Sequence, residues 1–211
     1  MLNKIRQSLA LSFAGGVMIG IGGTVNLYLG GIPGAVFFAV ALLTICLLGL
    51  HLFTGKVGAI VYSENKKHDG PLLLTCLIGN GLGTLLAAFI CNLSTSNALQ
   101  PIKQIAYTMC EGKLLKSVPA VLASAFMCGI LMYVAVTIYS EKNNIAGILF
   151  CVPVFILSGY EHSIADMFYF FAAGMFGTQT FVFILLAVVG NSLGGCFIPL
   201  MRKLAGYKPA K

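Results

Sequence analysis

A polar interruption occurs twice in this otherwise apolar sequence. The first interruption is HLFTG at residues 51–55, and the second is EHSIAD at residues 161–166. An offset of 111 residues places His51 opposite His162. The same offset aligns two later segments with the spacing Gly-Asn-x-x-Gly, whose asparagines are Asn80 and Asn191. A repeated break in an apolar chain is typical of a membrane transporter or channel core, in which the site lies where the two breaks meet.

The composition places the chain in a membrane. The sequence is 58% hydrophobic and 9% charged, whereas about a quarter of the residues in soluble domains are charged. A transmembrane helix needs about 20 mostly apolar residues. The candidate segments are residues 8–29, 32–50, 71–92, 117–140, 145–160 and 179–201. We therefore expect an all-α protein of six transmembrane helices that forms one domain over residues 1–211.

The second and fifth segments are predicted to be broken inside the membrane. The second is apolar up to Leu50 and is then interrupted, and the fifth is interrupted around Gly159. Non-helical backbone at membrane depth is tolerated only where protein or a water-filled cavity covers it. Because each half contains an odd number of spans, the two halves insert with opposite orientations. We expect two inverted three-helix repeats, at about residues 8–92 and 117–201, joined by a linker at residues 93–116.

The basic residues predict the orientation, because short cytoplasmic loops collect lysine and arginine. With the N-terminus inside, nine basic residues fall on the cytoplasmic side, namely Lys4, Arg6, Lys66, Lys67, Lys142, Arg202, Lys203, Lys208 and Lys211. Three fall outside: Lys103, Lys113 and Lys116. This topology accounts for most of the net charge of +7, with attraction to anionic lipid as a lesser contribution, so no nucleic-acid partner is expected. Both termini are predicted to be cytoplasmic, in a prokaryotic inner membrane.

Ionisable side chains inside membrane segments are functional candidates by default. His162, which follows Glu161, is the most conspicuous. It either donates a proton or hydrogen bond to a passing anion or only stabilises the bundle. Thr54 in the opposite break supplies a hydroxyl group, either to a pore or to freed backbone groups. For His51 we favour a structural or vestibule role.

Two further charged residues, Lys56 and Asp166, occupy nearly equivalent places in the two halves. Each would be costly alone in the membrane. An ion pair between them, or one with Glu161, would relieve that cost. Alternatively, Lys56 lies in a cytoplasmic vestibule and attracts anions. The sequence leaves these alternatives open.

Three bulky apolar residues of the broken helices, Phe38, Leu42 and Phe155, have two interpretations. Generic helix packing is the default for each of them. Bulky apolar side chains also constrict pores by excluding water. The residues alone favour packing.

The two interrupted stretches, together with the two Gly-Asn helices, closely resemble the formate/nitrite transporter family over about residues 10–201. The resemblance implies an aquaporin-like protomer with one pore per subunit, assembled as a homopentamer. It also implies that His162 is the central pore histidine and that Thr54 on the facing loop is its hydrogen-bond partner. The other residues that it assigns to the pathway are Leu52, Phe53, Phe38, Leu42 and Phe155. Supporting or vestibule roles are expected for Glu161, Lys56, Asp166, His51, Asn80 and Asn191.

Members of this family pass small monovalent anions of weak acids, such as formate, nitrite, lactate or hydrosulfide, often together with a proton. A physical account fits this activity, because an apolar constriction excludes a bare charge and proton sharing near His162 lets the anion cross nearly neutral. The chain departs from the family pattern at several positions, three of which lie in or beside the interrupted stretches. The family usually has an acidic residue at His51 and asparagine at both Lys56 and Asp166. These departures leave the preferred anion, the direction of transport and the gating open.

Two alternatives to anion transport are also considered. One is a channel for water or small uncharged molecules, because a fold alone does not determine its cargo. The other is a membrane-embedded metalloenzyme that uses His51, His162 and Glu161, although three ligands on two facing breaks are few for zinc or iron. The seven cysteines contain no Cys-x-x-Cys pair. We expect no enzyme activity and neither metal nor cofactor.

Overall fold

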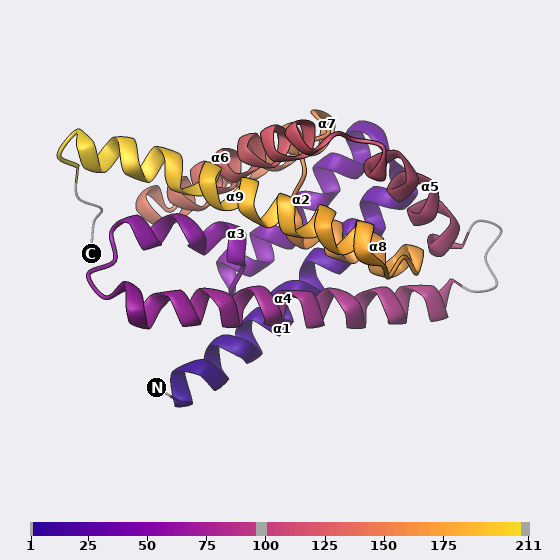
Figure 1. The fold of residues 1–211 in the computed structure, drawn as a ribbon, viewed down its shortest axis with the longest axis horizontal. Helices are drawn as coiled ribbons and strands as arrows, with labels where there is room; N and C mark the ends of the chain where they lie inside the picture. The colour runs from indigo at the N-terminus through magenta and orange to yellow at the C-terminus, as the bar shows by residue number, and fades with distance from the viewer. Residues whose placement is uncertain (1, 96–100, 208–211) are drawn as a thin grey trace.

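The computed structural model describes residues 2–95 and 101–207, and within these ranges it contains helices and no strands (Figure 1). The first half consists of α1 (Leu2–Leu29), α2 (Gly31–Leu47), α3 (Phe53–Lys56), the 3-10 helix η1 (Val57–Val61) and α4 (Lys66–Ser94). The second half consists of α6 (Val118–Lys142), α7 (Ala146–Leu157), α8 (Ser163–Ala173) and α9 (Thr178–Leu204). Between the halves lies α5 (Ile102–Leu114).

The two halves contain their elements in the same order. Each has a long helix, a shorter apolar helix, a break, a short helix and a second long helix. The long helices α1, α4, α6 and α9 are long and apolar enough to cross a membrane, and α2, α7 and α8 are shorter apolar helices. The predicted interruption of the second and fifth segments is therefore present, because α2 and α7 both end before the polar residues.

The long helices pack in close pairs, α1 with α4 and α6 with α9. Glycine makes this approach possible at the end of each Gly-Asn-x-x-Gly segment. A Cβ atom on Gly83 would lie 2.1 Å from the carbonyl oxygen of Phe13, and one on Gly194 would lie 1.9 Å from that of Phe126. Small residues in this position let two membrane helices touch through their backbones. This packing fixes α4 and α9 against the helices that begin the two halves.

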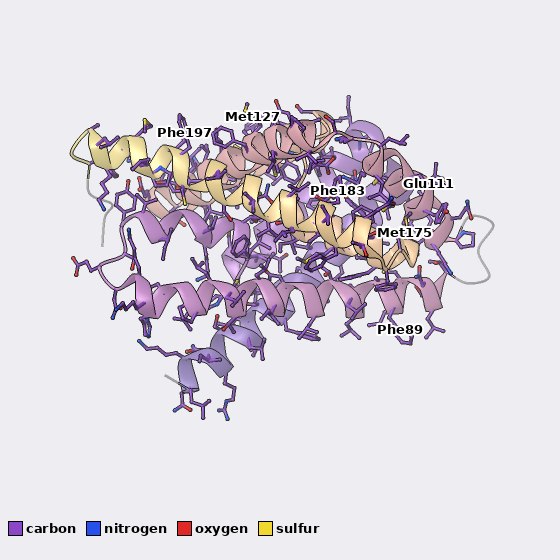
Figure 2. The ribbon with its side chains drawn as sticks, viewed as in Figure 1. Phe89, Glu111, Met127, Met175, Phe183 and Phe197 are labelled. Carbon is purple, nitrogen blue, oxygen red and sulfur yellow. The ribbon has the colours of Figure 1, made fainter. Side chains whose placement is uncertain are left out.

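The outer surface of the bundle is apolar. Large side chains such as Phe89 and Phe197 are exposed, whereas Phe183 is buried between helices (Figure 2). A soluble monomer rarely exposes a contiguous apolar surface of this kind. The exposed faces therefore suit a hydrocarbon environment.

The predicted linker at residues 93–116 contains a packed helix, which the sequence analysis did not anticipate. Residues 96–100 of this linker lie outside the described residues, but α5 follows them and packs against α8. Ile102, Ala106 and Cys110 on α5 are fully buried. The helix lies at one end of the bundle, and the start of α1, the start of α4 and the end of α9 lie at the other (Figure 1).

The two breaks correspond to each other with an offset of 110 residues. The helices before the breaks end at Leu47 and Leu157, and those after them begin at Phe53 and Ser163. Each break contains a glycine in the left-handed region, Gly49 with φ 64° and Gly159 with φ 65°. A residue with a side chain is strained there, so glycine marks the point at which each helix stops.

This offset corrects the alignment made from sequence. His51 corresponds to Glu161, and Leu52 corresponds to His162, so the expectation that His51 is the counterpart of His162 is wrong. The asparagines of α4 and α9 keep an offset of 111 because the second half has one more residue between its break and its asparagine. The two breaks are therefore similar in backbone and different in side-chain chemistry.

Candidate functional site

The first break is held by one buried side chain, Asn80 on α4. Its Oδ1 atom accepts a hydrogen bond from the backbone N–H of Phe53 at 2.8 Å. Its Nδ2 atom donates to the carbonyl oxygens of Ser12 at 2.7 Å and His51 at 2.9 Å. The amide therefore satisfies backbone groups that the interrupted helix cannot pair itself.

The second break is held in the same way by Asn191 on α9. Its Oδ1 atom accepts from the N–H of Ser163 at 2.8 Å, and its Nδ2 atom donates to the carbonyl oxygens of Ala125 and Glu161, both at 2.8 Å. Asn191, like its counterpart in the first half, is fully buried. The two asparagines hold the breaks against the long helices α4 and α9. Neither asparagine lines one of the cavities described below.

The two breaks meet through Thr54 and His162. The Thr54 Oγ1 atom lies 2.8 Å from His162 Nε2, and both side chains are buried. The other ring nitrogen, Nδ1, accepts a hydrogen bond from the backbone N–H of Ala165 at 3.1 Å. Because Nδ1 accepts, the proton of the neutral imidazole is assigned to Nε2, which donates to Thr54. The hydroxyl hydrogen of Thr54 then has no acceptor among the described residues and is free to donate to a ligand.

Aromatic rings from the two broken helices cover the imidazole. The ring of Phe155 on α7 stacks on His162, with centroids 5.5 Å apart and an interplanar angle of 23°. Phe38 on α2 contacts Phe155 edge to face, with centroids 6.0 Å apart. Leu42 lies one helical turn after Phe38 and is also buried. The histidine therefore sits against apolar side chains, where an isolated charge is strongly disfavoured.

The remaining predicted pathway residues, Leu52 and Phe53, are buried beside Thr54. They belong to the first break, in which Leu52 precedes the short helix α3 and Phe53 begins it. Leu52, like Leu42, lines a cavity on the α3 side of the Thr54–His162 contact, whereas Phe53 lines none of the cavities described below.

Cavities lie on both sides of this apolar region. The α5-side cavity has a volume of about 300 Å³ and is lined by residues that include Phe155, His162, Lys113, Lys116 and Asp166. The α3-side cavity has a volume of about 230 Å³ and is lined by residues that include Leu42, Leu50, Leu52, Lys56 and Val136. The phenylalanine–histidine stack therefore borders one cavity, and the leucines border the other.

Lys56 and Asp166 do not form an ion pair. Asp166 Oδ1 lies 2.9 Å from Lys113 Nζ, and Lys113 also contacts Glu161. Lys116 Nζ lies 2.5 Å from the other Glu161 carboxylate oxygen. Sequence reasoning treated both of these lysines only as topology markers. The available signal was that two carboxylates inside apolar segments require basic partners.

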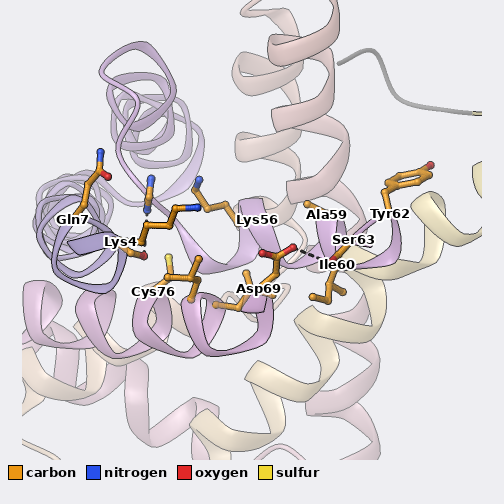
Figure 3. Close-up of a pocket in the computed structure, with 13 residues that line it drawn as sticks. Lys4, Gln7, Lys56, Ala59, Ile60, Tyr62, Ser63, Asp69 and Cys76 are labelled. Atoms are coloured by element: carbon orange, nitrogen blue, oxygen red, sulfur yellow. Dashed lines mark hydrogen bonds between the residues drawn. The ribbon is translucent and has the colours of Figure 1, made fainter. Parts of the chain in front are cut away.

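Lys56 is exposed and forms no ion pair among the described residues. It lines the α3-side cavity and also a second one, the α1–α4 cavity, which has a volume of about 470 Å³. Lys4 extends toward Lys56 in this cavity (Figure 3). Of the alternatives left open by the sequence, the ion pair of Lys56 with Asp166 or Glu161 is absent among the described residues, and the vestibule role of Lys56 stays a prediction.

His51 also lines the α1–α4 cavity, and its Nδ1 atom lies 3.5 Å from Ser8 Oγ. His51 and His162 thus line different cavities. The carboxylate of Glu161 is occupied by two lysines, and no group of three histidine, cysteine or acidic residues suitable for a metal ion occurs in the part of the chain that the structure describes. The geometry gives the metalloenzyme alternative no support.

Comparison with known proteins identifies the family of this chain. The formate/nitrite transporter family model matches residues 1–204. The chain is similar to the uncharacterized transporter YrhG of Bacillus subtilis, with 29% identity over 95% of this chain and 85% of that protein.

Two solved structures show the same fold. One is described as an FNT family ion channel, with a TM-score of 0.81 and 18% identity over 99% of this chain and 100% of that chain. The other is a pentameric formate channel with formate bound, with a TM-score of 0.80 and 21% identity over 97% of this chain and 98% of that chain. With its apolar helices and a family match over nearly its whole length, the chain is an integral membrane protein that belongs to the formate/nitrite transporter family.

Proposed function

We propose that this protein carries a small monovalent weak-acid anion, of the formate, nitrite or hydrosulfide type, across the membrane through one pathway in each chain. The observation that supports this proposal most strongly is the contact between Thr54 and His162. It lies between two cavities with lysine in their linings and is enclosed by apolar side chains. A polar, uncharged contact in an apolar constriction suits a solute that sheds its charge in transit.

The mechanism follows from the order in which the solute meets the two cavities and the apolar constriction between them. Lys56, which has no ion pair among the described residues, attracts the anion from water on the α3 side. The side chains of Phe38, Phe155 and Leu42 make entry of a bare charge unfavourable, because burying an unpaired anion costs many kcal/mol. The Nε2–H of His162 and the free hydroxyl hydrogen of Thr54 offer hydrogen bonds at the crossing point. A proton that travels with the anion removes its charge there, so transport is coupled to proton movement.

The proposal also includes a membrane topology with six crossings. Four crossings are made by α1, α4, α6 and α9, and two are made by α2 with α3 and by α7 with α8. Two observations support two inverted repeats in an aquaporin-like arrangement. The elements follow the same order in both halves, and in each half the asparagine of the last long helix bonds to the backbone of the break. Most of the basic residues that were assigned to the cytoplasm lie at the end of the bundle opposite α5, which supports cytoplasmic termini in a prokaryotic inner membrane.

A homopentamer embedded in lipid is the proposed assembly. The relative with a TM-score of 0.80 is a pentameric channel, and the chain matches it over 97% of its length. Exposed apolar side chains on the long helices provide surface for both neighbouring protomers and lipid.

The test is formate uptake into proteoliposomes that hold the purified protein and a pH-sensitive dye. Wild-type protein is expected to carry formate, and His162→Ala is expected to abolish or strongly reduce the flux. His68→Ala is the matched control, because His68 is partly exposed in the first turn of α4 and bonds only to residues near it in sequence. Equal flux of wild type and His162→Ala for every small anion tried would contradict the proposal. Osmotic swelling with no dependence on the anion would instead indicate a channel for neutral solutes.

A further inference from the structure

The α5-side cavity contains a balanced cluster of charges. Asp166, Lys113 and Lys116 of this cluster line the cavity, and Glu161 lies behind them. Both carboxylates are fully buried. Lys113 bridges both carboxylates, while Lys116 is one-third exposed, pairs with Glu161 and donates a hydrogen bond to the carbonyl oxygen of Gly159. The four charges sum to zero. The cluster therefore offers a bare anion little net attraction once it has left the mouth of the cavity.

One oxygen atom in this cluster has no partner. Both oxygens of Glu161 contact lysine, and Oδ1 of Asp166 contacts Lys113. The remaining oxygen, Asp166 Oδ2, is buried and has no hydrogen-bond partner among the described residues. A buried acceptor without a donor is unfavourable, and such groups in native proteins call for an explanation.

The position of Asp166 relates this unpaired oxygen to the transport pathway. The residue lies in the first turn of α8, beside Ala165, whose backbone N–H fixes the ring of His162. Asp166 lines the same cavity as His162 and Phe155. The other titratable side chains that line this cavity are Lys113, Lys116, Tyr160 and Tyr169. A solute that approaches His162 from the α5 side thus passes the Asp166 carboxylate.

We infer that Asp166 Oδ2 is the acceptor of a binding subsite for the protonated, uncharged form of a small weak acid. Such a molecule carries at least one acidic hydrogen, from which Asp166 Oδ2 accepts a hydrogen bond. A bare anion has no hydrogen to donate and is repelled by the carboxylate. The subsite therefore discriminates against anions of strong acids, which stay unprotonated. This inference rests on the proposed transport of weak acids and adds a residue that selects the transported form.

The test compares formate with nitrate, a strong-acid anion of similar size and the same charge. Uptake of each into proteoliposomes is measured at one pH by ion chromatography of the lumen. Asp166→Asn keeps an oxygen for Lys113 but replaces the unpaired acceptor with a donor. The ratio of formate to nitrate flux is expected to fall at least about tenfold, because a hydrogen bond to a charged group is lost and a repulsive charge is removed.

Glu111→Gln is the matched control. Glu111 is exposed on the same helix as Lys113, two residues away (Figure 2), so the substitution removes one carboxylate without touching the cluster. Its flux ratio is expected to equal that of wild type. An unchanged ratio in Asp166→Asn, with normal formate flux in wild type, would overturn the inference and leave the proposed function intact. Absence of formate flux in wild type would overturn both.

A measurement on the wild-type protein keeps the inference testable if Asp166→Asn does not fold. At pH values well above the pKa of formic acid, each unit of pH decrease raises the concentration of the uncharged acid tenfold. The total formate concentration that gives half-maximal uptake from the α5 side is therefore expected to fall about tenfold per unit. A half-saturating concentration that does not change with pH would contradict a subsite for the protonated acid.

Discussion

Replacing Thr54 with valine removes one hydroxyl group from the centre of the proposed pathway and leaves the shape of the side chain almost unchanged. Thr54 is buried, and its Oγ1 atom lies 2.8 Å from His162 Nε2. In Thr54→Val the Nε2–H of His162 faces a methyl group. The variant therefore tests the hydrogen bond that joins the two breaks without opening a cavity.

The magnitude follows from the loss of a single buried hydrogen bond. A buried donor left without its acceptor costs about 1–3 kcal/mol, and about 1.4 kcal/mol corresponds to a tenfold change. Thr54→Val also removes the hydroxyl hydrogen that is free to donate to the passing solute. Formate flux is therefore expected to fall by about tenfold or more, and the free energy of unfolding by about 1–3 kcal/mol.

The assay is initial formate uptake into proteoliposomes, normalised to the amount of folded protein, with thermal unfolding in detergent measured in parallel. Thr54→Ser is the matched control, because serine keeps the hydroxyl group and loses only a methyl group. Its flux is expected to stay within about threefold of wild type, which is less than the loss of one hydrogen bond produces. Wild-type flux in Thr54→Val would refute the role of this hydrogen bond in transport.

The other predictions concern packing, ion pairing and the vestibule. Gly194→Ala places a Cβ atom 1.9 Å from the carbonyl oxygen of Phe126 and is expected to destabilise the α6–α9 pair by about 1–3 kcal/mol, whereas Gly70→Ala meets no atom within 4 Å and is expected to unfold at the wild-type temperature or above. Equal unfolding temperatures for the two variants would contradict the close packing. Lys113→Met leaves two buried carboxylates without their shared partner, so a loss of about 3–5 kcal/mol in the free energy of unfolding is expected by denaturant titration; unchanged stability would argue against the cluster. Lys56→Asn is expected to raise the half-saturating formate concentration only for entry from the α3 side, with a smaller effect at high ionic strength, and an equal change for both directions would contradict the vestibule role.

The positions of the breaks could be predicted from sequence because polar residues are rare in this chain. A polar run between apolar segments has few physical explanations at membrane depth, and α2 and α7 do end just before the two runs. The contact between Thr54 and His162 followed from the resemblance to the family. The register between the halves was wrong by one residue at the breaks. The signal that gives the correct register is the glycine pair Gly49 and Gly159, since both have positive φ and mark the helix ends.

The role of α5 could not be predicted in the same way. The helix has 13 residues, too few to span a membrane, and its segment is polar enough to resemble a connecting loop. Lys113 precedes Glu161 by 48 residues, so no local pattern indicates their contact. The pairing of Lys113 with Asp166 depends on how α5 packs on α8. These ion pairs therefore depend on tertiary packing and not on a local sequence pattern.

The number of protons that enter with each formate ion shows whether the solute crosses the constriction as an uncharged acid. Formate uptake and lumenal pH are measured together in proteoliposomes whose membrane potential is held at zero and then changed. Passage as an uncharged acid through the apolar constriction at His162 predicts one proton per formate and uptake that does not respond to the membrane potential. Formate entry without acidification of the lumen, driven by the membrane potential, would instead mean that the bare anion crosses the constriction.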